Sequence, residues 1–193
     1  MLYTRKGDDG TTKVFNSKTG IRMSKSSCQT ETLGSLDELG SFLGLVKVKV
    51  VDLSWIVNYS NRHVKKGKSP AEIIHWVQNC LFIIQAEIAG ADKKISREKV
   101  NEIEKMIDII EKELPPIKTF FISGGTEIVA LFDIARTLAR KAERRTVGGV
   151  ERKEFKVGTT TPAFLNRLSS LLYALARLSA YKSGINEESP SYR

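Results

Sequence analysis

Cysteine, histidine and proline are scarce in this 193-residue sequence, which contains two, two and five of them. Cys28 and Cys80 stand far apart, and neither belongs to a Cys-x-x-Cys pair. This excludes a disulfide scaffold and argues against a zinc ribbon or a thiol redox motif. We therefore expect both thiols to pack between helices in a reducing compartment.

The scarcity of histidine restricts catalysis and metal binding. A Ser-His-Asp or Cys-His nucleophilic centre has little material. Residues 72–75 (Glu-Ile-Ile-His) match half of the motif of di-iron bundles, but His63 has no glutamate three residues before it. The sequence predicts no metal site built from protein ligands.

Long apolar runs are also absent. None approaches the roughly 18 residues of a membrane span. Residues 1–6 lead into glycine and aspartate instead of the apolar core of a signal peptide. We expect a cytoplasmic protein without membrane contact.

Hydrophobic residues at 41% and charged residues at 27% exclude whole-chain disorder, and the length fits one domain.

Positive charge is what the sequence has in excess. Its 31 lysines and arginines outnumber 22 acidic residues, for a net charge of +9. Such a surplus favours an anionic partner, which could be a phosphorylated ligand, nucleic acid or a membrane surface. Charge alone does not choose among these.

Two kinds of sequence divide the chain. Residues 1–24 are rich in glycine, threonine, serine and lysine and lack helical periodicity, whereas apolar residues recur at helical spacing through most of the rest. We predict an N-terminal arm over residues 1–24, a helical domain over 25–185 and a polar tail over 186–193.

Five helices are predicted from caps, apolar spacing and prolines. Their expected starts are Ser26–Ser27, the residue after Pro70, Ser96, Thr126 and Pro162. Pro115 should stop the third helix, and the fourth should end near Val147, before Gly148–Gly149. With no convincing strand pattern, the expected fold is all-α: a five-helix up-and-down bundle with a flexible N-terminal arm.

Two local features accompany this plan. Gly40 and Gly44 in the first helix should let a neighbouring backbone approach closely. Residues 50–70 are ambiguous, because residues 53–59 hint at a short amphipathic helix whereas residues 62–68 are typical of a basic loop.

The arm has the composition of an anion-binding turn. Gly7 and Gly10 permit conformations in which backbone N–H groups converge on an anion, and Arg5, Lys6 and Lys13 add charge. A triphosphate fits this description, although no Gly-Lys-Ser/Thr makes it a Walker A loop. The alternative is a flexible, turn-rich tail.

A ladder of guanidinium groups occupies the fourth helix, where Arg136, Arg140 and Arg144 recur every four residues. Like charges at this spacing repel, so an anion or a carboxylate from another helix should offset them. The opposite, buried face is expected to carry Leu131, Ile134, Leu138 and Ala142. The alternative is a solvated basic face.

Asp37 and Glu38 interrupt the apolar first helix. At least one of them should face inward or lie at the border of the core, where a buried carboxylate needs a cationic partner. The arginine ladder could supply it. The alternative is that both point to water.

Six motifs occur in a fixed order along most of the chain. They are residues 3–12, Arg22–Lys25, Leu36–Leu39, Phe120–Gly125, Ala135–Arg145 and Phe164–Ser169. This set resembles the PduO-type ATP:cob(I)alamin adenosyltransferases. The resemblance implies a homotrimer in which ATP and cob(I)alamin meet between adjacent subunits, and an arm that orders around ATP. It also implies transfer of the 5′-deoxyadenosyl group of ATP to cobalt, giving adenosylcobalamin and triphosphate.

The resemblance further implies individual roles. Arg136 would pair with Asp37 across the subunit boundary, and Phe120 would help displace the lower axial ligand of the corrinoid, although by itself Phe120 is typical of a core residue. Mg²⁺ is expected with the triphosphate, and a flavoprotein reductase as a partner. The residues matching ATP contacts are Thr4, Arg5, Gly7, Asp8, Gly10, Thr11, Thr12, Lys25, Arg140, Glu143, Arg144 and Asn166.

The sequence departs from the family pattern at Ser123, Asp133, Lys141 and Ser170, where the family usually has Pro, His, Arg and Asp. A competing interpretation is a basic helical module that binds nucleotides or nucleic acid without catalysis. Glu143 inside the ladder and the few aromatic neighbours argue against nucleic acid, so none is expected as a partner.

Overall fold

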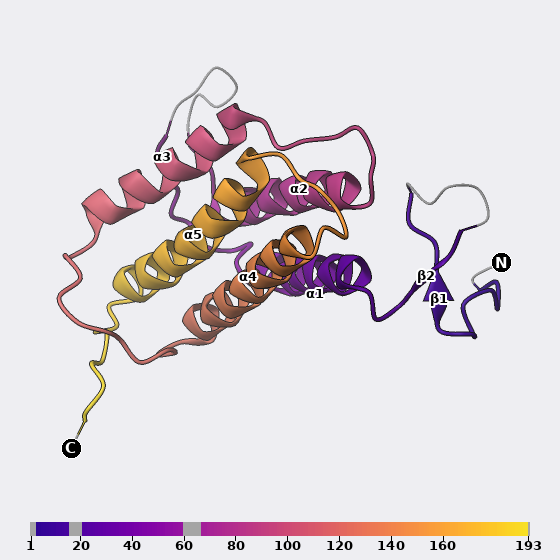
Figure 1. Cartoon of the computed structure of the whole chain (residues 1–193). Helices are drawn as coiled ribbons and strands as arrows, with labels where there is room; N and C mark the ends of the chain where they lie inside the picture. Colours follow the sequence, from indigo (N-terminus) through magenta and orange to yellow (C-terminus); the bar gives the residue numbers. More distant parts are fainter. Residues whose placement is uncertain (1–2, 16–20, 60–66, 193) are drawn as a thin grey trace.

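Five long helices make up most of the computed structural model, which describes residues 3–15, 21–59 and 67–192. They are α1 (Cys28–Lys49), α2 (Pro70–Ile88), α3 (Arg97–Glu113), α4 (Glu127–Glu151) and α5 (Thr160–Lys182). α5 packs against α3 and α4, and α1 packs against α2 and α4 (Figure 1). The predicted all-α bundle of five helices is confirmed.

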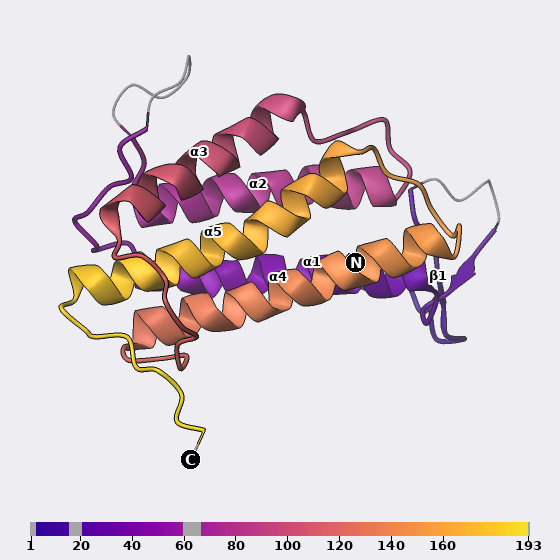
Figure 2. The ribbon, with the colours of Figure 1, turned by 60° about the vertical axis from the view of Figure 1, so that its left-hand side comes forward.

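The bundle separates the two chain ends (Figure 1). The N-terminal arm lies beyond the end where α1 begins, while the C-terminal residues leave from the opposite end. Figure 2 shows the same bundle from a second side, with α5 between α3 and α4. Within the described ranges, no helix is both long and apolar enough to cross a membrane.

Side-chain caps define four of the helix starts. The hydroxyls of Ser27, Ser69, Ser96 and Thr126 each accept a hydrogen bond from the backbone N–H three residues later. Ser69 and Glu72 form a reciprocal capping box, and Pro70 occupies the first turn, where its missing N–H costs nothing. These local signals are strong, which explains why sequence located these starts closely.

The end of α4 was predicted wrongly. The helix continues through Gly148 and Gly149 to Glu151 instead of ending near Val147. A Cβ atom at Gly149 would lie 2.2 Å from Cε1 of Phe155, so this glycine provides space for a ring. The helix continues because tertiary packing, and not a left-handed turn, requires the glycine.

The buried face of α4 also differs from the prediction. Apart from Gly149, its apolar members are small residues and one large ring, namely Val129, Phe132, Ala135, Ala139 and Ala142. Of the expected apolar positions only Ala142 is buried, and Ile134 is 47% exposed. Alanines are needed because α4 contacts both α1 and α5.

A glutamine, not a backbone segment, approaches the α1 glycines. The Gln78 side-chain amide donates to the Gly40 carbonyl over 3.0 Å. Its Nε2 atom would be 3.6 Å from a Cβ at Gly44. The predicted close backbone approach is therefore wrong, and a polar side chain fills the space.

Two short regions contain extended pairing that the sequence did not predict. In the arm, β1 (Thr11–Thr12) pairs antiparallel with β2 (Met23–Ser24). After α1, Val57 pairs with Lys68 where a short helix was one of the alternatives. Two-residue pairings are too short to produce an alternating pattern. Most of the basic stretch 62–68 lies outside the described residues.

A buried carboxylate fixes the start of α5, which has no side-chain cap of its own. Glu87 of α2 is 6% exposed. It accepts hydrogen bonds from the Gly158 backbone N–H over 2.7 Å and from the Thr161 hydroxyl over 2.5 Å. A negative group is favourable at a helix N-terminus, so Glu87 joins α2 to α5.

We expect Glu87→Ala to lower the free energy of unfolding by about 2–4 kcal/mol, because it leaves two buried donors without an acceptor. Chemical denaturation followed by circular dichroism measures this. The matched control is Asp108→Ala, which removes an exposed carboxylate from α3. Equal stability of the two variants would contradict the assigned role.

Candidate functional site

The arginine ladder lies along the border of the buried face of α4. Ala135 and Ala139 are buried beside Arg136 and Arg140, which places those arginines next to α5 and the connector at residues 114–126. The Arg136 side chain is 27% exposed, whereas Arg140 and Arg144 are exposed to solvent. The three groups keep the predicted one-sided arrangement at helical spacing.

A cavity of about 610 Å³ opens between the connector, α4 and α5. One wall carries Arg136 and Arg140, and the other carries aromatic residues of the connector. Its lining includes Phe120, Phe121, Ser169, Ser170 and Tyr173. Such a mixture of cationic groups and large apolar surface suits a ligand that is both anionic and extensively apolar.

Phe120 is 79% exposed at the edge of this cavity. The interpretation of Phe120 as a core residue is therefore wrong for the single subunit. An aromatic ring held in water loses the stabilisation of burial, which amounts to several kcal/mol for a large ring. The position is well suited to contact a bulky ligand.

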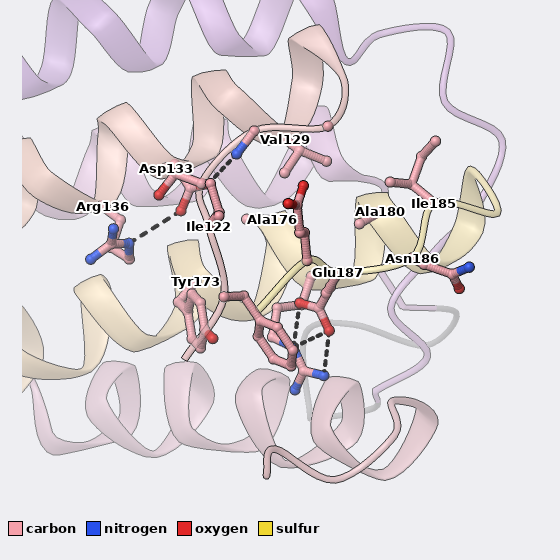
Figure 3. Close-up of a pocket in the computed structure, with 16 residues that line it drawn as sticks. Ile122, Val129, Asp133, Arg136, Tyr173, Ala176, Ala180, Ile185, Asn186 and Glu187 are labelled. Carbon is pink, nitrogen blue, oxygen red and sulfur yellow. Dashed lines mark hydrogen bonds and ion pairs between the residues drawn. The ribbon is translucent and has the colours of Figure 1, made fainter. Parts of the chain in front are cut away.

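Asp133 connects the ladder to the connector (Figure 3). Its Oδ1 atom lies 3.4 Å from Nε of Arg136, and its Oδ2 accepts a hydrogen bond from the Gly124 N–H over 3.3 Å. The Arg136 guanidinium also lies 5.9 Å from the centre of the Tyr173 ring. In this subunit, therefore, Asp133 supplies the carboxylate that the ladder was expected to need.

Asp133 is a residue whose place in the site was not predicted. The sequence marked it only as a departure from the family pattern. Its spacing of three residues before Arg136 was the available signal, because such pairs share one face of a helix. The contact to Gly124 could not be found in this way, since it depends on the path of the connector.

Glu143 and Asn166 meet where α4 and α5 lie side by side. Asn166 Nδ2 donates to Glu143 Oε1 over 3.0 Å, and Arg167 donates to the Asn166 amide oxygen over 3.0 Å. An apolar hollow of about 220 Å³ adjoins this pair and is lined by Glu143, Val147, Val150, Pro162 and Leu165. Two predicted contact residues are thus brought together beside a small apolar surface.

The arm folds into a compact turn around its glycines. Lys25 Nζ donates to the Gly7 carbonyl over 2.7 Å, and the Lys25 N–H donates to the Gly10 carbonyl over 2.9 Å. Gly10 has φ of +78°, a region that favours glycine. The predicted residues Gly7, Gly10, Thr11 and Lys25 therefore belong to one local structure.

Asp9 and Arg22 stabilise that turn, and neither was among the predicted site residues. Thr11 donates to Asp9 Oδ1 through its hydroxyl over 2.7 Å and through its N–H over 3.0 Å. The hydroxyl bond lowers the pKa of the Asp9 carboxyl below its ordinary value. Arg22 donates to the Thr11 hydroxyl and carbonyl over 2.5 and 2.8 Å.

The structure does not bring the arm onto the ladder of the same subunit. The arm joins the bundle at the first turn of α1, where the Thr30 hydroxyl donates to the Ser24 carbonyl over 3.3 Å. From there it extends beyond the end of the bundle, clear of α4 (Figure 1). The two groups of predicted ATP residues are separate within one chain.

Asp37 and Glu38 are both exposed in the single subunit, so neither faces the core, and the alternative that both point outward describes them. Leu36, Leu39 and Leu43 set the buried face of α1 and turn the carboxylates outward. Glu38 pairs with Lys141 of α4 over 2.6 Å. Asp37 instead borders an open groove with Leu33 and Phe82, away from Arg136.

Comparisons with known proteins show the family of this chain. A family model described as cobalamin adenosyltransferase matches residues 2–179, nearly the whole chain. The chain belongs to this family. The resemblance inferred from six motifs is thereby confirmed.

Individual members of the cobalamin adenosyltransferase family match along most of the chain. A corrinoid adenosyltransferase of Bacillus subtilis (strain 168) is 34% identical over 190 residues, covering 96% of this chain and 90% of the relative. The corrinoid adenosyltransferase PduO of Citrobacter freundii is 35% identical over 185 residues, which cover 91% of this chain but 49% of that protein.

A solved structure supports the fold. It is a variant of the PduO-type ATP:corrinoid adenosyltransferase from Lactobacillus reuteri, complexed with cobalamin and ATP. The two folds superpose with a TM-score of 0.82 at 24% identity, covering 100% of this chain and 97% of that one. At this identity the similarity shows that the five-helix architecture is shared.

Metal ligands do not gather at this family member's site. No group of three or more histidine, cysteine, aspartate or glutamate side chains among the described residues could hold a metal ion.

Cys28 is half-buried, with its Sγ atom 2.7 Å from Nη1 of Arg152. Cys80 is buried between helices, and burial raises the pKa of its thiol to about 12.

We expect Gly10→Ala to weaken ATP binding roughly 5–30-fold, because a side chain at positive φ costs about 1–2 kcal/mol and distorts the turn. Isothermal titration calorimetry with MgATP measures the affinity. The control is Gly148→Ala, which adds a methyl group inside α4. Unchanged affinity in Gly10→Ala would show that the arm does not bind the nucleotide in this conformation.

Proposed function

We propose that this chain transfers the 5′-deoxyadenosyl group of ATP to the cobalt of cob(I)alamin at the cavity beside Phe120. The carrying observation is that an exposed aromatic ring, Phe120, lines the same opening as Arg136 and Arg140. Family membership and the full-length relatives confirm the predicted enzyme class, a corrinoid adenosyltransferase.

The chemistry is a displacement at carbon that needs positioning more than acid–base groups. The electron pair of Co(I) attacks C5′ of the ribose and forms the cobalt–carbon bond. The C5′–O bond breaks, and its electron pair leaves with the triphosphate. The scarcity of histidine is compatible with this reaction, because no proton must be moved at the reacting carbon.

Charge on the departing triphosphate is the main electrostatic demand. We assign its neutralisation to Arg140 and Arg144 on α4 and to Lys25 in the arm. Fixed cations stabilise charge as it develops without having to reorganise. Mg²⁺ enters with ATP as part of the substrate, where phosphate oxygens and water are its usual ligands, and we assign it no protein ligand.

The arm supplies the remaining phosphate contacts. We assign these contacts to the glycine-containing turn formed by residues 7–12, and Arg5 adds a cation. Thr4, Asp8 and Thr12 are assigned to the same nucleotide contacts. The adenine ring fits the apolar hollow beside Glu143 and Asn166, whose carboxylate and amide can recognise its polar edge.

Phe120 has a separate role on the corrinoid. Its exposed ring can occupy the lower face of the corrin and displace the axial ligand there. Four-coordinate Co(II) is more easily reduced to Co(I), so an apolar group at this face promotes the reduction that must precede transfer. We expect a flavoprotein reductase to supply the electron in the cytoplasm.

The complete site requires two subunits. The arm lies apart from α4 within one chain (Figure 1), and Asp37 and Arg136 line two different hollows. A trimer in which each arm reaches the neighbouring ladder would unite them, with Asp37 approaching Arg136 across the boundary. Asp133 already contacts Arg136, so that guanidinium would then lie between two carboxylates.

The activity is tested by mixing the protein with MgATP and chemically reduced cobalamin. The Co(I) spectrum should change to that of a light-sensitive alkylcobalamin, with one triphosphate released per turnover. Omission of ATP is the control. Correctly folded protein that produces no alkylcobalamin would overturn the proposed function.

Replacement of Arg140 by alanine should lower kcat roughly 100-fold, because it removes a cation that stabilises the leaving group. The thermal unfolding midpoint should not change, since the side chain is exposed. Arg145→Ala is the control, because this exposed arginine of the same helix pairs with Glu31. An Arg140→Ala enzyme with normal kcat would refute the leaving-group role.

Mixed trimers test the shared site. Lys25→Ala and Arg140→Ala chains should each be nearly inactive alone, but co-expression with different tags should restore activity. In randomly mixed trimers about one quarter of the sites combine an intact arm with an intact ladder. If both groups served their own subunit, the mixture would remain as inactive as its parents.

A further inference from the structure

Residues 185–188, which follow α5, return along the connector that carries Phe120. At the end of α5, Gly184 adopts φ of +67°, and the Ile185 N–H donates to the Ala180 carbonyl over 3.0 Å. This left-handed turn reverses the chain direction at the helix end. Residues 185–188 are thereby directed along the connector before the chain leaves the bundle.

Arg177 is the central contact of this return. It is 6% exposed although it carries a permanent charge. Its Nε and Nη2 atoms donate to both carboxylate oxygens of Glu187 over 2.8–3.0 Å, and Nη2 also donates to the Pro115 carbonyl over 3.1 Å. A buried guanidinium with a bidentate partner is strongly oriented.

The same guanidinium contacts the connector a second time, since its Cζ atom lies 5.3 Å from the centre of the Phe121 ring. The backbone adds another bond, in which Ile122 N–H donates to the Glu188 carbonyl over 2.8 Å. A Cβ atom at Gly125 would lie 3.1 Å from Cγ2 of Ile185. The tail therefore meets the connector at Ile122 and Gly125, while Arg177 of α5 meets it at Pro115 and Phe121.

These contacts close a second cavity, of about 270 Å³, behind the connector (Figure 3). The second cavity and the larger one beside Phe120 share three lining residues, Phe121, Arg136 and Tyr173. Displacement of the tail would therefore move groups that also form the proposed corrinoid site. The proposed mechanism does not use Arg177, Glu187 or the tail.

We infer that the Arg177–Glu187 ion pair positions the connector, so that residues 185–188 hold Phe120 where the corrinoid binds. This inference rests on the proposed function. Arg177 and Glu187 do not touch the reacting atoms and act through Phe121 and the backbone of residues 115–122. Loss of the ion pair should therefore affect binding of the corrinoid and not of ATP, because Glu143 and the other ATP residues of α4 and α5 are not among these contacts.

The test is Glu187→Gln, which keeps the size of the side chain but removes the charge that orients Arg177. The KM for cob(I)alamin and the Kd for cob(II)alamin should rise about tenfold or more, because a displaced connector misplaces the groups that bind the corrinoid. The KM for ATP should remain at the wild-type value. With ATP present, less of the bound Co(II) should show the absorption of the four-coordinate form.

The matched control is Glu113→Gln. Glu113 of α3 pairs with Lys182 at the end of α5. Lys182 lies just before the tail in sequence, but this pair is not among the contacts between the tail and the connector. This variant should keep the wild-type KM for both substrates. Thermal unfolding of all three proteins separates general loss of stability from displacement of the connector.

Limited trypsin digestion gives a readout independent of activity. Lys118 is an exposed residue of the connector, and cleavage after it should be faster in Glu187→Gln than in wild type or Glu113→Gln. Unchanged cleavage together with an unchanged cob(II)alamin Kd would overturn the inference. An equal rise in KM for both substrates would also overturn it, whereas inactive wild-type protein would refute the proposed function instead.

Discussion

The close contact of α4 with both α1 and α5 is the constraint on which the site depends. Small side chains at Ala135, Ala139 and Ala142 allow α4 to lie between its neighbours. Because Ala135 and Ala139 face inward, Arg136 and Arg140, which follow them in sequence, lie at the border of the buried face. The position of the arginine ladder is thus a consequence of packing. Repulsion between its like charges is offset when an anion binds there.

The connector between α3 and α4 is held from two directions. Asp133 binds it near Gly124 from the α4 side, while on the other side Arg177 of α5 binds it at Pro115 and the tail binds it at Ile122. A segment without secondary structure has few internal bonds to fix its path. These external contacts explain how an irregular segment can present Phe120 in a defined place while the ring itself stays in water.

Several groups that are suited to bind a ligand or another chain are exposed in the single subunit. Phe120 and Phe82 are 79% and 71% exposed, Asp37 faces outward, and the arm extends from the end of the bundle. Exposed aromatic rings beside polar groups are typical of surfaces that bind a ligand or another chain. The proposed trimer and its two substrates account for these surfaces together.

Sequence alone determined the five-helix fold class, most of the helix starts and the family. Caps such as Ser69 and Ser96 and apolar residues at helical spacing act over one or two turns, so they could be identified without a fold. The ordered motifs were sufficient for the family. The close contact of Phe155 with Gly149, the pairing of Asp133 with Gly124 and the Arg177–Glu187 bond were decided only by tertiary structure. Each joins segments whose distance in space no local pattern encodes.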